Sequence, residues 1–128
     1  MSERPQELRY TKSHEWLRIE GDVVTVGITD FAVNHLGDLV FVDLPSVGDD
    51  VTAGETACEV ESVKAVGEVY APVSGEVIEA NDDLGDDPSP LASDPFGAGW
   101  LFKVRATDLD TAETLDLAAY EAQLAAEG

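Results

Sequence analysis

Residues 59–72 read EVESVKAVGEVYAP, and this stretch predicts two short strands that fold back on each other with Lys64 near the bend. β-Branched and small side chains dominate residues 56–62, and residues 66–70 hold two valines and a tyrosine, which favour a strand. Pro72 has no N–H group, so it ends the second strand. A lysine at such a tip extends on a flexible four-carbon stem, where a modifying enzyme can reach its amine.

Lysine is scarce in this chain, which has only Lys12, Lys64 and Lys103 among 128 residues. A surface lysine is usually a solvated cation, and this is the simpler interpretation of Lys64 on its own. The segments on either side of the hairpin favour a functional role for this lysine.

A short pattern occurs on both sides of the hairpin. Upstream, residues 37–40 read GDLV and residues 48–51 read GDDV; downstream, residues 75–78 read GEVI and residues 85–88 read GDDP. Such a repeat implies two related β units that bury their apolar faces against each other, with Lys64 near a quasi-twofold axis between them. Chance is the alternative, because glycine and aspartate are abundant in the chain.

The composition is that of one globular domain. The chain has 128 residues, 44% of them hydrophobic, which is enough for a core. No apolar run reaches the length of a transmembrane helix, and residues 1–7 lack the features of a secretory signal or a transit peptide. We therefore expect a cytoplasmic protein, with the mature form of a targeted protein as the alternative. The single cysteine, Cys58, alternates with Val60 in a strand pattern, which indicates a small core residue rather than a reactive thiol.

The charge is strongly acidic, with 7 Lys and Arg against 27 Asp and Glu and a net charge of −20. This balance disfavours nucleic acids and anionic membranes as partners, because both attract basic surfaces. Our hypothesis is that the protein comes from a halophile, since multimolar salt shortens the Debye length to about 3 Å and suppresses self-repulsion. An acidic protein of a mesophile is the alternative.

Periodicity and turn residues predict a mainly β fold with short helices at its periphery. Besides the hairpin, the expected strands cover residues 14–20, 23–28, 39–44, 75–80 and 100–106, and the expected helices cover 30–36, 90–93 and 110–127. Thr29 or Asp30 can cap the first helix, Gly37 can end it, and residues 1–9 form a polar tail. We expect two small sheets, packed as a sandwich or flattened barrel, in a single domain of residues 1–128.

The C-terminal helix has its own signals. Leu117, Tyr120 and Leu124 recur at positions i, i+3 and i+7, which indicates one apolar face. Asp110, with Glu113 three residues later, resembles a capping box at the start of the helix.

Motifs for catalysis and metal binding are scarce. The only histidines are His14 and His35, and the chain has neither a glycine-rich phosphate loop nor a nucleophile elbow. Residues 81–89 are acidic, but their spacing does not match the twelve-residue calcium loop. We therefore expect a solvated acidic turn and no metal site.

Six segments together resemble one known family. They read SHEW (13–16), VGITD (26–30), GDLVFVDLP (37–45), VESVKA (60–65), APVSGEV (71–77) and GWLFKV (99–104). In this order they resemble the glycine cleavage system H proteins, and the resemblance extends from about Leu8 to Tyr120.

The resemblance implies the fold and the chemistry. It implies the barrel-sandwich hybrid of lipoyl- and biotinyl-carrier domains, with lipoate joined to Lys64 as an amide, and a carrier that is not itself an enzyme. The implied partners are a pyridoxal-phosphate-dependent glycine decarboxylase, a tetrahydrofolate-dependent aminomethyltransferase, dihydrolipoamide dehydrogenase and a lipoylating enzyme. The arm would shuttle an aminomethyl group from the first to the second and be reoxidised by the third. We expect a monomer, because a carrier must dissociate between several enzymes.

The resemblance also implies roles for four further residues. Ser13, Glu15 and Glu68 would line a cleft that shelters the loaded arm, since carboxylates favour a cationic amine, and Glu61 would help the lipoylating enzyme to recognise the hairpin. Each residue has a simpler alternative: Glu15 faces solvent, Ser13 caps a turn, and Glu61 and Glu68 only solvate the tip. The residues at the bend lack the Asn-Gly or Asp-Gly pair that favours a tight hairpin, so the position of Lys64 depends on the resemblance.

Other functions stay open at this stage. An H-like protein that donates lipoyl groups to other complexes needs the same Lys64 and the same hairpin. Biotinyl domains usually have methionines beside the lysine, and lipoyl domains of 2-oxoacid dehydrogenases have an aspartate before it, whereas Val63 and Ala65 flank it here. A cofactor-free acidic interaction module is the alternative from a different class.

Overall fold

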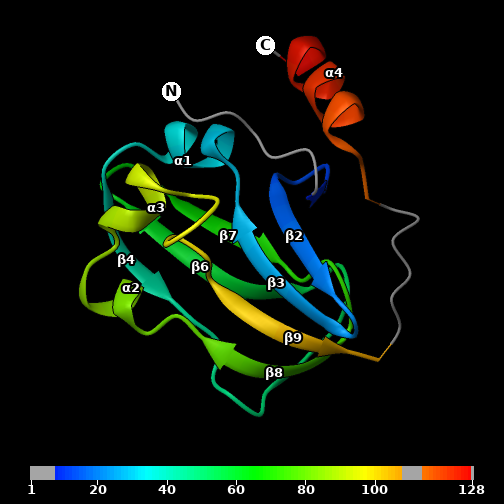
Figure 1. Ribbon diagram of the computed structural model, residues 1–128. Helices are drawn as coiled ribbons and strands as arrows, with labels where there is room; N and C mark the ends of the chain where they lie inside the picture. The colour runs from blue at the N-terminus through cyan, green and yellow to red at the C-terminus, as the bar shows by residue number, and fades with distance from the viewer. Residues whose placement is uncertain (1–7, 108–113, 128) are drawn as a thin grey trace.

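The computed structural model describes residues 8–107 and 114–127 of the chain (Figure 1). It contains two antiparallel sheets that face each other, one with six strands and one with three. The six-stranded sheet contains, in spatial order, β1 (Arg9–Tyr10), β2 (Glu15–Glu20), β3 (Val23–Ile28), β9 (Phe102–Ala106), β8 (Gly75–Ala80) and β5 (Asp50–Val51). The three-stranded sheet contains β4 (Leu39–Asp43), β6 (Thr56–Ser62) and β7 (Val66–Tyr70). The helices are α1 (Asp30–Leu36), α2 (Asp83–Asp86), α3 (Ser89–Ser93) and α4 (Leu117–Glu127).

The predicted fold class is confirmed: the chain is mainly β, its two sheets form an open sandwich rather than a closed barrel, and its helices lie outside the sheets (Figure 1). The repeated sequence pattern on either side of the hairpin corresponds only in part to repeated structure. Its first elements, residues 37–40 and 75–78, lead into β4 and β8 on opposite sheets. Its second elements differ, because residues 48–51 enter β5 whereas residues 85–88 leave α2.

The core lies between the sheets, where the alternating strand residues that point inward meet. The large sheet and the short helices contribute Leu17, Val24, Val26, Val77, Leu84, Leu91, Phe102 and Val104, and the small sheet contributes Val42, Cys58, Val60 and Val69. Burying each large aliphatic side chain stabilises the fold by about 1.5–3 kcal/mol. Cys58 is part of this core, as predicted, and burial, with the nearby charges of Asp43 and Glu59, raises the pKa of its thiol to about 12.

Helix α1 confirms the prediction at both ends. The Thr29 hydroxyl accepts a hydrogen bond from the Ala32 amide at 3.4 Å, which caps the first turn. Gly37 ends the helix with φ +80°, a conformation that favours glycine, and its amide donates to the Val33 carbonyl. Leu36 packs closely on Gly67 of β7, where an added Cβ would lie 3.0 Å from a Leu36 methyl. This contact holds α1 beside the lysine hairpin.

The ends of the chain differ from the prediction. Residues 8 and 9 are not part of a tail: Leu8 is buried, and Arg9 begins β1. The C-terminal helix begins at Leu117 rather than at residue 110, because the Tyr10 and Leu115 backbones bond to each other at 2.8 and 2.6 Å and hold Leu115 extended. The proposed capping pair, Asp110 and Glu113, lies outside the described residues.

A second cluster explains this arrangement. Leu8, Tyr10, Trp16, Phe96 and Tyr120 are buried together, away from the main core. The tyrosine rings of this cluster stack in parallel with their centroids 4.8 Å apart. A short polar segment at the N-terminus therefore becomes a strand because its two large residues pack against α4.

The acidic segment at residues 81–89 is more ordered than predicted. It contains α2, whose Leu84 is completely buried, and the start of α3. One buried leucine thus fixes a segment whose other residues indicated a loop. Within the described residues, no cluster of three or more His, Cys, Asp or Glu could hold a metal, and no helix is long and apolar enough to span a membrane.

Candidate functional site

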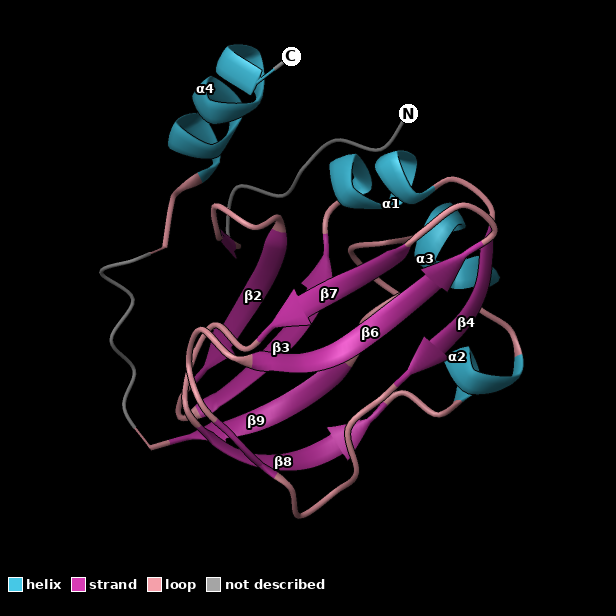
Figure 2. Ribbon diagram, turned by 180° about the vertical axis from the view of Figure 1, so that it is seen from behind, coloured by secondary structure: helices cyan, strands magenta, loops and turns pink. Residues whose placement is uncertain are grey.

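Lys64 lies at the tip of the hairpin formed by β6 and β7, as predicted. The two strands pair up to Glu61 and Val66, which leaves Ser62 to Ala65 as the turn (Figure 2). Lys64 is exposed, and so is Val63 before it. The amine of Lys64 is therefore accessible to a modifying enzyme.

The turn is closed by a side chain that sequence reasoning did not use. The Ser62 hydroxyl donates to the Ala65 carbonyl and accepts from the Ala65 amide, both at 3.0 Å. The Ser62 amide also donates to the Ala65 carbonyl, at 2.8 Å. Serine closes turns through such side-chain to backbone bonds, which explains why the bend forms without an Asn-Gly pair. The serine two residues before the lysine was the available signal.

The tip is also fixed to the start of β4. The Val63 amide donates to the Asp38 carbonyl at 2.9 Å. The stem of Lys64 lies over Gly37, where an added Cβ would be 3.5 Å from the lysine Cε. The lysine side chain therefore lies at the C-terminal end of α1.

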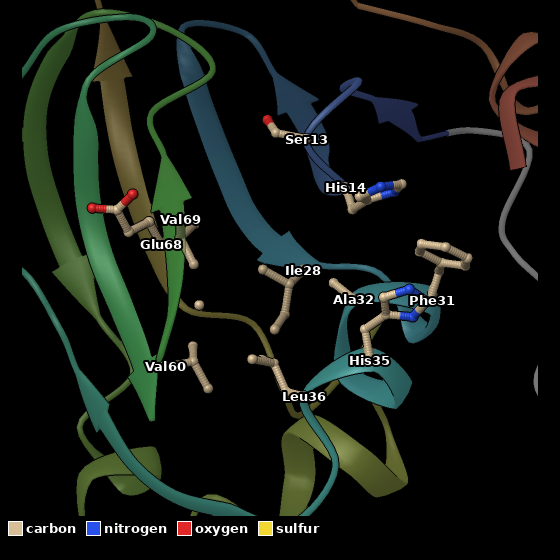
Figure 3. Close-up of a pocket in the computed structure, with 11 residues that line it drawn as sticks. Ser13, His14, Ile28, Phe31, Ala32, His35, Leu36, Val60, Glu68 and Val69 are labelled. Carbon is tan, nitrogen blue, oxygen red and sulfur yellow. The ribbon is translucent and has the colours of Figure 1, made fainter. Parts of the chain in front are cut away.

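A largely apolar groove of about 530 Å³ begins beside this point and continues between α1 and the hairpin (Figure 3). Its apolar lining comes from Ile28, Phe31, Ala32, Leu36, Val60 and Val69. Its polar lining comes from Ser13, His14, His35 and Glu68. The groove thus has an apolar middle, with Leu36 near Lys64 and polar groups elsewhere on its walls.

Aromatic rings form one wall of the groove. The His14 ring packs on Phe31 at 4.6 Å between centroids, and Phe31 packs on His35 at 4.4 Å (Figure 3). His14 has φ 73°, an uncommon backbone conformation for a residue other than glycine. The Tyr120 hydroxyl bonds to His14 Nδ1 at 2.8 Å and to the Thr29 hydroxyl at 2.7 Å. Helix α4 thereby supports this wall from behind.

Glu15 is buried behind the groove, and the alternative that it faces solvent is wrong. Only 1% of its surface is exposed. Its carboxylate accepts hydrogen bonds from the Thr11 and Ser13 hydroxyls at 2.6 Å each, and from the Tyr70 amide at 3.3 Å. Burial raises the pKa of this carboxyl, and the hydrogen bonds partly offset that effect. Because Glu15 is on β2 and Tyr70 on β7, the carboxylate also connects the two sheets.

The structure brings part of the predicted cleft together. Ser13 and Glu68 both line the groove, whereas Glu15 lines an adjoining cavity of about 450 Å³ and reaches the groove through Ser13. Glu68 accepts a hydrogen bond from the Tyr70 hydroxyl at 3.0 Å, and this contact raises the pKa of Tyr70. Glu61 does not line the groove but lies exposed on the outer side of the hairpin.

Comparison with known proteins decides the family. A family model described as "Glycine cleavage H-protein" matches residues 8–127. The chain belongs to the glycine cleavage H-protein family.

Individual H proteins match over most of their length. The H protein of Streptomyces coelicolor is 62% identical over 105 residues, which cover 81% of this chain and 84% of that protein. The H protein of Alteromonas mediterranea is 55% identical over 123 residues, which cover 94% and 95%. The crystal structure of the H protein of Mycobacterium marinum superimposes with a TM-score of 0.89 at 47% identity, covering 95% of this chain and 99% of that one. The predicted fold and family are therefore confirmed.

Proposed function

We propose that Lys64 carries a lipoyl group in amide linkage, and that the groove beside it shelters the end of the loaded arm. The observation that supports this best is the position of an exposed lysine, on a turn closed by Ser62, next to an apolar groove. The chain is a lipoyl carrier of the glycine cleavage system and not an enzyme, as its family membership indicates.

The residues present fit such a group. The apolar lining, which includes Leu36, Val60 and Val69, suits an alkyl chain and a ring, and Leu36 directly precedes the glycine over which the lysine stem lies. A lipoyl group supplies the sulfur chemistry, and the protein supplies presentation and exclusion of water.

The polar groups of the groove suit a cationic amine. The Ser13 hydroxyl donates a hydrogen bond to the Glu15 carboxylate. The lone pairs of the Ser13 oxygen therefore stay available to accept a hydrogen bond from an ammonium group. Glu68 adds a carboxylate at the rim of the same groove, since its side chain points to the outer face of edge strand β7 (Figure 3). We therefore assign Ser13 to contact with the amine, Glu68 to attracting it at the rim of the groove, and Glu15 to holding Ser13 in place and adding negative charge behind it.

The partners in this proposal are the pyridoxal-phosphate-dependent decarboxylase, the aminomethyltransferase, dihydrolipoamide dehydrogenase and a lipoylating enzyme. Glu61 is assigned to recognition by the lipoylating enzyme, because it is exposed three residues before Lys64 and faces away from the groove. We also propose that the chain is adapted to high salt, which its net charge of −20 supports.

The test is glycine-cleavage turnover reconstituted with these partners. Lys64→Arg keeps the charge but cannot form the lipoyl amide, so turnover should fall to background with the fold intact. Lys103→Arg is the matched control, since Lys103 pairs with Glu79 at 3.3 Å on the other sheet, and this variant should retain full turnover. Turnover by the Lys64→Arg variant would refute the proposal.

A further inference from the structure

Exposed apolar side chains gather at one end of the small sheet. Six large hydrophobic side chains are exposed in the described part of the chain, and four of them lie on β4 and around the lysine turn: Val40, Phe41, Val63 and Val66. Their exposed fractions are 54%, 44%, 75% and 55%. On a surface that is otherwise strongly acidic, such a concentration marks an interaction site rather than scattered surface residues.

The strand register places these residues on one face of the small sheet, around Glu61. Phe41 of β4 lies opposite Glu61 of β6, and Glu61 lies opposite Val66 of β7, so Glu61 lies between the two apolar side chains in one row across the outer face of the sheet. The bond from the Val63 amide to the Asp38 carbonyl places Val63 beside the start of β4. We call Phe41, Val63 and Val66, the three apolar residues that flank Glu61, the apolar row. In Figure 2 the outer face of this sheet is turned toward the viewer.

A row of acids runs beside the apolar row. Asp43 lies opposite Glu59, and Glu59 lies opposite Glu68, in the next outward-facing positions of the same strands. Strands β4, β6 and β7 contain no lysine or arginine. The basic residue next to this face is Lys64, in the turn between β6 and β7. The face therefore presents exposed apolar side chains on both sides of Glu61 next to the lysine turn, and further negative charge beyond them.

We propose that this face is the docking surface for the enzyme that acylates Lys64, and that the enzyme meets it with an apolar patch bordered by lysine and arginine side chains. The inference rests on the proposed function. A bare lysine extends only four carbons from the turn, so the acylating enzyme must cover the turn and the apolar row next to it. Enzymes that use the finished arm act at its far end and can dock elsewhere. Complementary charge then orients the pair and speeds their encounter.

The reaction to be followed is the transfer of lipoate from its adenylate to the chain. The lysine amine attacks the acyl carbon, the amide bond forms, the bond to the phosphate oxygen of AMP breaks, and the amine loses a proton. The enzyme, lipoate and ATP are supplied with the unmodified chain, and the rate is measured by intact mass against the concentration of the chain.

Two substitutions test the apolar row. Phe41→Ser and Val66→Thr should each raise the KM for the chain about tenfold, equivalent to about 1.4 kcal/mol, with kcat unchanged, because the lysine and its turn are intact. Val47→Ser and Ile19→Thr are the matched controls: both residues are exposed, at 66% and 37%, but lie away from the hairpin. Their KM should stay within about twofold of the parent value.

The acid row has a separate readout. With Asp43→Asn and Glu59→Gln combined, the KM should depend less on salt than it does for the parent chain. Thermal unfolding of every variant checks that the fold is kept. Parent-like KM values for both Phe41→Ser and Val66→Thr would overturn the docking surface while leaving the carrier role intact. A parent chain that is never acylated at Lys64 would instead overturn the proposed function, and this inference with it.

Discussion

The turn that carries Lys64 depends on one hydroxyl group, and Ser62→Ala removes it. The hydroxyl makes two bonds to Ala65, each 3.0 Å long, from a position that is only 9% exposed. After the substitution the Ala65 carbonyl keeps its bond to the Ser62 amide at 2.8 Å, so only the Ala65 amide loses its partner.

The magnitude follows from these contacts. A net hydrogen bond contributes about 0.5–1.5 kcal/mol, and because Ala65 is exposed, water can replace part of the loss. We expect the free energy of unfolding to fall by about 1 kcal/mol, which corresponds to a Tm lower by about 3–5 °C for a chain of this size. The same loss is a larger fraction of the free energy of opening the turn, because the turn can open without global unfolding and that opening free energy is smaller than the global one.

The assay is amide hydrogen exchange measured by NMR together with thermal unfolding. The Ala65 amide should exchange about tenfold faster in Ser62→Ala than in the parent chain. Ser62→Thr keeps the hydroxyl and should restore slow exchange. Ser74→Ala is the matched control: the Ser74 hydroxyl accepts from the Ala53 amide at 2.9 Å in a different loop, so its loss should leave Ala65 unchanged. Unchanged exchange at Ala65 in Ser62→Ala would refute the role of this hydroxyl.

Three further predictions concern the groove wall, the buried carboxyl and the surface charge. Tyr120→Phe keeps the stack on Tyr10 but loses the hydroxyl bonds to His14 and Thr29, so the free energy of unfolding should fall by about 1–2 kcal/mol in denaturant titration, with a changed His14 ring shift by NMR; no change in either would contradict it. Burial raises the pKa of the Glu15 carboxyl above its ordinary 4.5, so the folded state holds the carboxyl proton more tightly than the unfolded state does. The stability that this bound proton contributes is complete below pH 4.5 and is lost as the pH rises through the pKa of the folded state. Glu15→Gln should therefore flatten the pH dependence of Tm above 4.5, and an identical profile would count against this origin. The Tm of the parent chain should rise from dilute buffer to molar KCl, and a constant Tm would exclude adaptation to salt.

Local signals in the sequence were sufficient for elements whose structure depends on nearby residues. Helix α1 could be predicted with its ends because Thr29 and Gly37 act within one turn of it. The hairpin strands followed from their β-branched residues, although the lysine was placed by resemblance and not by turn chemistry.

Contacts between distant residues account for what could not be predicted. Tyr10 becomes part of a strand because it pairs with Leu115, which is more than one hundred residues away. Glu15 is buried because the Tyr70 amide and the Thr11 and Ser13 hydroxyls satisfy it, and nothing in its neighbours along the chain indicates that burial. A periodic pattern shows which residues face inward, but not which distant group will meet them.

In the candidate site, too, some features follow from the sequence and others depend on contacts between distant residues. Lys64 and Ser13 were identified from segments that resemble a family, whereas the support of His14 by Tyr120 needed the structure. The apolar row is also a product of register, since Phe41 and Val66 come to flank Glu61 only when β4, β6 and β7 are aligned.

The central claim is that Lys64 carries the lipoyl group, and the most direct measurement is intact mass with peptide mapping after incubation with a lipoylating enzyme, lipoate and ATP. The account predicts one lipoyl amide per chain, located on Lys64. An unmodified chain that is folded, under conditions in which a control carrier is modified, would contradict it, and so would modification at Lys12 or Lys103 in place of Lys64.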